Sequence, residues 1–241
     1  VLSAQTSNLF GETSSTSKAR KLQLAVAFAE AGQTDVAKLC LRRLVSGSAE
    51  PEWIHAVSQV ELARILCREH QLMPAALILE ALLPKLVCIK KRWSWLEHME
   101  ACTILGGCYS RMGRFIDAEK LLFFVIESYM KNPNSCWRRV VKAMQEIAGF
   151  YSARYDFDLA CETHRVAVRI LDAEEQDPSR IALANIELAR AEVRAGEVSP
   201  AIDRFITSIG TLRKRKHDTW ATAALPNARE ELGDLIKPSK R

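Results

Sequence analysis

Residues 105–118 read LGGCYSRMGRFIDA, and this stretch decides the fold. Two small residues, Gly106 and Ala118, stand twelve positions apart on either side of Gly113. Small residues are typical of places where two helices cross closely, because a larger side chain would hold the helices apart. A glycine between them permits the left-handed backbone of a tight turn. The stretch therefore predicts two antiparallel helices joined at Gly113.

The same spacing occurs five times along the chain, and each copy is called a repeat below. An anchor alanine recurs at intervals of 38 to 43 residues, at Ala37, Ala75, Ala118, Ala160 and Ala201. A small residue precedes each anchor by twelve positions, at Ala25, Ala63, Gly106, Ala148 and Ala189. The residue five before each anchor falls in the expected turn, at Gly32, His70, Gly113, Tyr155 and Gly196. Five copies in register predict an array of helix pairs, in which stacking buries what no single pair could bury alone.

Two further repeat positions are apolar with one exception each. Nine residues before the anchor stand Phe28, Leu66, Tyr109 and Tyr151, but Glu192 in the fifth repeat. Four residues after it stand Leu41, Leu79, Leu122 and Phe205, but His164 in the fourth. We interpret His164 as a core or edge histidine rather than a catalytic one.

This pattern resembles the tetratricopeptide repeat (TPR). Residues 105–118 reproduce the L-G-x-x-Y and G-x-F-x-x-A signatures of that family almost letter for letter. The resemblance implies an all-α fold, a right-handed superhelical solenoid of antiparallel helix pairs. The period is longer than the usual 34 residues and is similar to the roughly 42-residue repeats of kinesin light chain-like adaptors.

The pattern divides the chain into three parts. Residues 1–17 are expected to form a flexible leader, residues 18–214 five TPR-like helix pairs, and residues 215–241 a capping helix with a basic tail. Asp177-Pro178 is a helix start, with a cap residue followed by proline at the first helical position. Pro74 and Pro200 occupy the same repeat position, which predicts that both lie in a first helical turn. Pro226 is expected to interrupt the last segment.

Catalytic and metal-binding patterns are sparse, so we expect no enzyme, no cofactor and no metal. The sequence holds no phosphate-binding glycine loop, no H-E-x-x-H and no G-x-S-x-G. His98 and Cys102 are four residues apart on a predicted helix, but zinc normally takes four ligands, and packing is the favoured role. Seven cysteines without C-x-x-C spacing favour free thiols in a reducing compartment, hence an intracellular protein, cytoplasmic or nuclear.

The resemblance also implies a concave groove lined by the first helix of each repeat. The inward positions selected as a partner-binding surface are Val60, Arg64, Thr103, Gly107, Lys142, Gln145, Gly149, Leu183, Ile186 and Arg190. Apolar walls with a few cations suit a partner peptide or helix that carries acidic residues. The glycines would let a backbone approach closely. The alternative is that these inner residues cover one another in a tight superhelix.

The function that these features favour is a non-enzymatic protein–protein interaction scaffold, one part of a larger protein or complex. The alternative is a nucleic-acid-associated helical repeat that uses basic linkers and the tail, since the chain carries +5 and its last 29 residues hold eight basic and four acidic residues. The linkers in question are 90–95, 138–142 and 213–216. No apolar run approaches the roughly 20 residues of a membrane span, so no membrane partner is expected.

Overall fold

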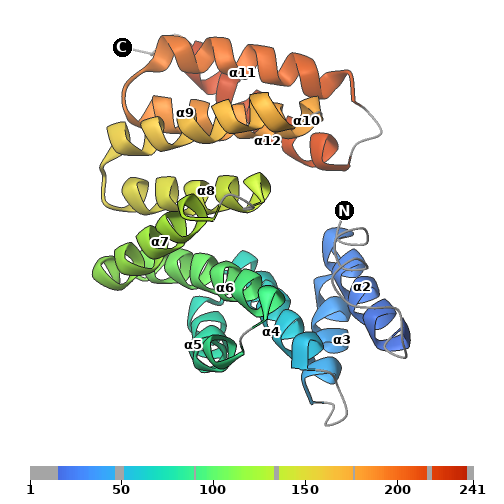
Figure 1. Cartoon of the computed structure of the whole chain (residues 1–241). Helices are drawn as coiled ribbons and strands as arrows, with labels where there is room; N and C mark the ends of the chain where they lie inside the picture. The colour runs from blue at the N-terminus through green and yellow to red at the C-terminus, as the bar shows by residue number, and fades with distance from the viewer. Residues whose placement is uncertain are drawn as a thin grey trace. The chain divides into compact units, whose positions relative to one another are not determined.

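The computed structural model describes residues 16–46, 52–89, 91–132, 136–175, 177–215 and 219–237. Within these ranges the chain forms eleven α-helices and no strand (Figure 1), which confirms the all-α repeat fold. The helices are α2 (Thr16–Glu30), α3 (Thr34–Ser46), α4 (Glu52–Arg68), α5 (Leu72–Cys88), α6 (Arg92–Arg111), α7 (Phe115–Met130), α8 (Trp137–Ala153), α9 (Phe157–Glu174), α10 (Pro178–Arg194), α11 (Val198–Arg213) and α12 (Thr219–Ile236).

The first ten of these helices form the five pairs that the sequence spacing predicts. Repeats one to five are α2–α3, α4–α5, α6–α7, α8–α9 and α10–α11. All five anchor alanines are fully buried, and so are the four alanines at the small position twelve residues earlier. At the fifth small position, Gly106, an added Cβ would stand 2.7 Å from Cγ of Leu122 and 2.8 Å from Cδ2. A Cβ at position 106 would therefore press on the Leu122 side chain where the helices of the third pair meet.

The turn within each pair has a left-handed residue at the predicted position. The φ angles are +78° at Gly32 and Gly113 and +86° at Gly196, with +60° at His70 and +66° at Tyr155. A Cβ disfavours this conformation, yet repeat geometry imposes it on His70 and Tyr155 as well. The spacing thus decides the backbone of these turns even where glycine is missing.

Helix starts follow the cap signals of the sequence. The Asp177 side chain accepts a hydrogen bond from the backbone N–H of Ser179 at 3.0 Å, and Pro178 begins α10. Pro74 and Pro200 each lie three residues into their helix, in the first turn, as expected. The interruption predicted at Pro226 is wrong, because α12 continues through it.

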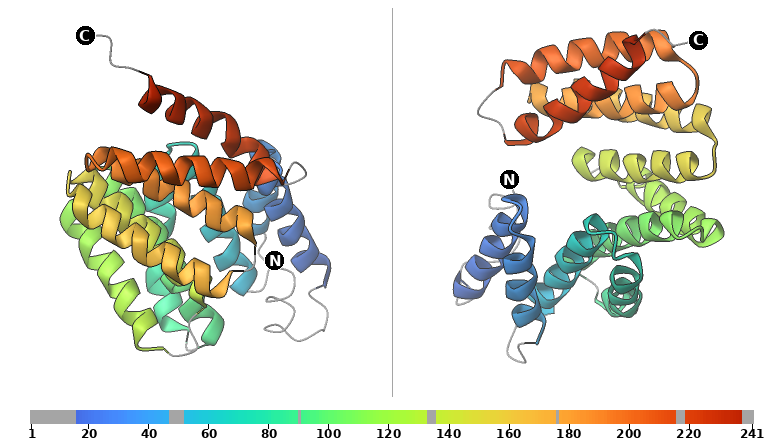
Figure 2. Two further views of the ribbon diagram at one scale, coloured as in Figure 1. Left: turned by 90° about the horizontal axis from the view of Figure 1, so that it is seen from above. Right: turned by 180° about the vertical axis from the view of Figure 1, so that it is seen from behind.

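The helices gather into two compact units, residues 1–125 and 126–241. In the first, each of α2 to α5 packs on the next helix, and α4 also contacts α2 and α6. In the second, α9 packs between α8 and α10, and α12 packs on α11 and on α10 (Figure 2). The leader prediction concerns residues 1–15, which lie outside the described ranges, and Thr16 and Ser17, where α2 begins.

Candidate partner-binding surfaces

The ten predicted groove residues all lie on first helices of their pairs. Val60 and Arg64 stand on α4, and Thr103 and Gly107 on α6, in the first compact unit. The second compact unit holds the other six, on α8 (Lys142, Gln145, Gly149) and on α10 (Leu183, Ile186, Arg190).

In the first compact unit the predicted face is largely buried. Val60, Thr103 and Gly107 are buried. Arg64 places Nη2 2.7 Å from Oε1 of Glu100 on α6, and the Arg64 side chain is only 22% exposed. Burial by itself would lower the pKa of Arg64, but Glu61 and Glu100 outweigh it and raise the pKa. Arg64 therefore joins the second repeat to the third, and it already has an internal acidic partner.

On α8 the predicted face is open. Lys142 and Gly149 are exposed and Gln145 is half-buried. The three residues are spaced so that they lie on one side of the helix. A Cβ added at Gly149 would meet no heavy atom within 4 Å. A backbone or helix could approach this side of α8 closely.

On α10 the predicted face is covered by the last helix. Ile186 is 2% exposed and belongs to a core cluster with Ala228 of α12, and Leu183 packs against that cluster. Arg190 donates to both carboxylate oxygens of Glu231 on α12, at 2.7 and 2.9 Å, and also pairs with Glu187. The acidic groups that Arg190 was expected to find on a partner are supplied by α12.

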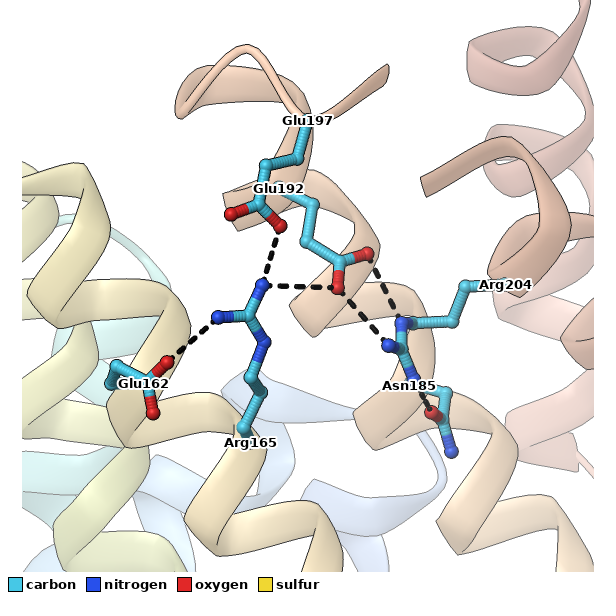
Figure 3. A network of polar contacts seen from close by, with 6 residues as sticks. All are labelled: Glu162, Arg165, Asn185, Glu192, Glu197 and Arg204. Carbon is cyan, nitrogen blue, oxygen red and sulfur yellow. Dashed lines mark hydrogen bonds and ion pairs between the residues drawn. The ribbon is translucent and has the colours of Figure 1, made fainter. Parts of the chain in front are cut away.

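Glu192 is the one charged residue at the repeat position nine residues before the anchor alanine. It lies in a buried ion-pair network (Figure 3). Arg204 of α11 approaches both Glu192 oxygens at 3.0 and 3.1 Å and donates to Oδ1 of Asn185 at 2.9 Å. Arg165 of α9 lies 3.8 Å from Glu192 and pairs more closely with Glu197. The network ties α9, α10 and α11 together. It was visible in the sequence only as a broken repeat position.

A cavity of about 480 Å³ lies beside this network, between α10 and α11. Its polar lining includes Asn185, Asp203, Arg204 and Thr207. Pro178 and Pro200 belong to the rest of the lining. Because the guanidinium of Arg204 is committed to Glu192, the cavity offers hydroxyl, amide and carboxylate groups rather than an anion site.

Apolar side chains on the second helices were missed by the sequence reasoning, which considered only first helices. Among the described residues, thirteen of the sixteen large exposed hydrophobic side chains lie on α3, α5, α7, α9 and α11. The most exposed in the first compact unit are Ile116 at 70%, Val87 at 64% and Leu77 at 58%. The repeat pattern describes only the buried positions, so it gives no information about these exposed residues.

His98 and Cys102 contact each other on α6. Sγ of Cys102 lies 3.8 Å from Nε2 of His98, whose ring meets Phe124 edge-on. Burial lowers the pKa of His98 and raises the pKa of Cys102 to about 12, so the thiol stays protonated at neutral pH. Within the described ranges, no group of three or more His, Cys, Asp or Glu residues could hold a metal ion.

The basic clusters are only partly described. Arg213, Lys214 and Arg215 are exposed, while Lys90 and Lys216 lie outside the described residues. Arg138 stacks on the Trp137 ring with its Cζ 4.8 Å from the ring centroid, and its Nη2 lies 3.6 Å from Glu175. Within the described part of the chain, no helix is long and apolar enough to cross a membrane.

Comparisons with known proteins identify the fold. Neither a family model nor a curated protein matches the sequence. Among solved structures, a kinesin light chain-like protein of Podosopora anserina with nearly identical TPR-like repeats is similar at 19% identity and a TM-score of 0.58, over 86% of this chain and 100% of that one. BtubC (BKLC) from P. vanneervenii is similar at 18% identity and a TM-score of 0.55, over 90% of this chain and 81% of that one.

A third solved structure, MamA from Desulfovibrio magneticus RS-1, has a TM-score of 0.51 at 14% identity, over 81% of this chain and 97% of that one. At such identities the likeness shows the fold alone. The chain has a TPR-type helical-repeat fold, which confirms the fold that the resemblance implied.

Proposed function

We propose that this chain is a non-enzymatic interaction scaffold of a reducing intracellular compartment, and that it binds a peptide or helix of a partner protein on the first-helix face of its repeats. The observation that carries the proposal is the open side of α8, where Lys142 and Gly149 are exposed and the space above Gly149 is empty. Similarity to a kinesin light chain-like protein and to BtubC supports a repeat scaffold rather than a catalytic domain.

The partner chemistry follows from which side chains are accessible. Lys142 offers an exposed cation to an acidic residue, and Gly149 allows close approach of a partner backbone or helix. The part of the Leu183 side chain that its packing against the core of α10 and α12 leaves exposed would supply an apolar anchor. Arg64 and Arg190 are already ion-paired within the chain, so an acidic partner would have to displace Glu100 or Glu231. Of these three cations Lys142 is the exposed one, and we infer from that exposure that it is the leading electrostatic contact.

A photocrosslinking amino acid at position 149 tests the proposal directly. The matched control is position 210 on α11, because Gly210 likewise has no heavy atom within 4 Å of an added Cβ. In an extract of the source cells, we expect a discrete protein adduct from position 149 and none from position 210. The adduct should weaken when Lys142→Glu is introduced. Equal labelling from both positions, or an adduct insensitive to Lys142→Glu, would contradict this binding face.

The nucleic-acid hypothesis is tested separately. Exposed Arg213, Lys214 and Arg215 could hold phosphates, and such binding would be strongest at low salt. A mobility-shift titration with single- and double-stranded probes at low ionic strength should show no complex if the scaffold proposal is right. A complex that is lost on neutralising Arg213 to Arg215 would instead favour the basic linkers as the functional surface.

A further inference from the structure

Two cysteines from neighbouring repeats approach each other inside the first compact unit. Sγ of Cys67 on α4 lies 2.8 Å from Sγ of Cys108 on α6, 41 residues further along the chain. Bonded sulfurs are about 2.05 Å apart, so the two atoms need to approach by only about 0.8 Å to be joined. Both residues sit within packed helices, which hold the thiols in place.

We propose that Cys67 and Cys108 are an oxidation site at which a hydroperoxide converts two thiols into a disulfide between the second and third repeats. The reduced pair is the resting form in a reducing compartment. The oxidised pair covalently joins α4 to α6.

The reaction balances as a two-electron oxidation. With hydrogen peroxide as the oxidant, a sulfur lone pair of Cys67 attacks one peroxide oxygen and the O–O bond breaks. The departing hydroxide takes the Cys67 proton, so the products are a sulfenic acid and water. The sulfur of Cys108 then attacks the sulfenic sulfur. The S–S bond forms, the S–O bond breaks, and the oxygen leaves as a second water with the Cys108 proton. The two thiols have then lost two electrons, and one peroxide has been reduced.

Exposure and proximity favour this order of events. Cys67 is 8% exposed whereas Cys108 is fully buried, so a molecule as small as hydrogen peroxide would reach Cys67 first. Once the sulfenic acid forms, Cys108 is already within contact distance, so the second step is effectively intramolecular. The more exposed Cys88 on α5 can react with peroxide, but it is not a member of this pair.

The bond would reinforce an interface that an ion pair already holds. Arg64 and Glu100 bridge the same two helices at 2.7 Å. Closing a loop of about 40 residues restricts the unfolded chain and so raises stability. Oxidation would therefore fix the second repeat against the third and make this part of the array more rigid.

Peptide mapping of the purified full chain tests the site. The reduced protein is treated with hydrogen peroxide, its remaining thiols are blocked, and it is digested without reductant. Trypsin leaves Cys67 on peptide 65–68 and Cys108 on peptide 93–111, which also carries Cys102. We expect these peptides to be linked with a mass about 2 Da below their sum, and fragmentation to place the bond at Cys108. Dithiothreitol should restore both free peptides.

Variants and a thermal readout complete the experiment. The linked peptide should vanish in Cys67→Ala and in Cys108→Ala and persist in Cys88→Ala. The wild-type melting temperature should rise on oxidation by at least about 5 °C and fall again on reduction. The proposal is overturned if peroxide adds oxygen to these peptides without linking them, if the bond goes to Cys102, or if the melting temperature does not rise. The wild-type map decides by itself should an alanine variant fail to fold.

Discussion

Glu192 on α10 is bound through both carboxylate oxygens by Arg204 on α11, although its side chain is only 1% exposed. The other four repeats carry Phe28, Leu66, Tyr109 and Tyr151 at the same position. The fifth repeat thus replaces an apolar contact with a buried ion pair. A buried charge is tolerated only while its partner remains, and replacing both partners by apolar side chains is often neutral.

Arg204→Met should therefore destabilise the chain strongly, whereas Glu192→Leu/Arg204→Met should not. The single variant leaves the buried Glu192 carboxylate with the more distant cation of Arg165 at 3.8 Å, and we expect a loss of about 3 kcal/mol. The double variant restores the apolar character of the other repeats and should return to within about 1 kcal/mol of the parent chain. Urea unfolding measures both. A double variant no more stable than Arg204→Met would show that Glu192 is needed for more than its ion pair.

Two glycines on first helices should respond in opposite ways to alanine. At Gly106 the new Cβ would stand 2.7 Å from Cγ of Leu122, which is itself fully buried, so we expect a loss of about 1–3 kcal/mol. At Gly149 no neighbour lies within 4 Å, so alanine should gain up to about 1 kcal/mol of helix stability. Thermal unfolding of both variants compares them.

A companion variant isolates the crossing contact at Gly106. Leu122→Ala removes the atoms that the new Cβ would meet, so Gly106→Ala should cost less in that background than in the parent chain. An equal cost in both backgrounds would place the origin of the effect elsewhere.

Sequence spacing predicted the helix pairs and their turns because these depend on local steric rules. The register required a left-handed residue at His70 and Tyr155 even though neither is glycine, and both have positive φ. Spacing also placed the groove residues on first helices. It could not say what covers those helices, because that depends on contacts between residues far apart in the sequence.

The pairing of Arg190 with Glu231 shows why the exposure of a predicted site is hard to read from sequence. Their side chains meet across 41 residues, and only because α12 packs on α10. The continuation of α12 through Pro226 has the same origin, since tertiary packing outweighs the helix-breaking tendency of one proline. Whether the predicted groove binds a partner stays a prediction.

His70→Gly should stabilise the second repeat. His70 is exposed and has a φ of +60°. A Cβ in this left-handed region costs about 1–2 kcal/mol, which glycine would avoid. Glycine also makes the unfolded chain more flexible, and this offsets part of the gain. We expect a net gain of about 0.5–1 kcal/mol in urea unfolding. His70→Ala keeps the Cβ and is the control that should show no gain. A gain of equal size from alanine would mean that the imidazole, and not the backbone, was the source of strain.

His164→Leu should make stability less sensitive to acid. Burial lowers the pKa of His164, and the nearby charge of Arg194 lowers it further, so the folded chain favours the neutral ring. The unfolded ring titrates near about 6.5, and the unfolded state therefore takes up the proton first as the pH falls. The stability that comes from keeping this ring neutral is fully present above about pH 6.5. It is lost as the pH falls from about 6.5 to the lower pKa of the folded state.

Leucine matches Leu41, Leu79 and Leu122 at the same repeat position and cannot take up a proton. We expect the urea midpoint of His164→Leu to fall less than that of the parent chain between about pH 7.5 and about pH 5.5. Burial also lowers the pKa of His98, so His98→Gln in the His164→Leu background should flatten the remaining slope. A His164→Leu profile parallel to that of the parent chain would show that the ring is protonated as readily in the folded state as in the unfolded one.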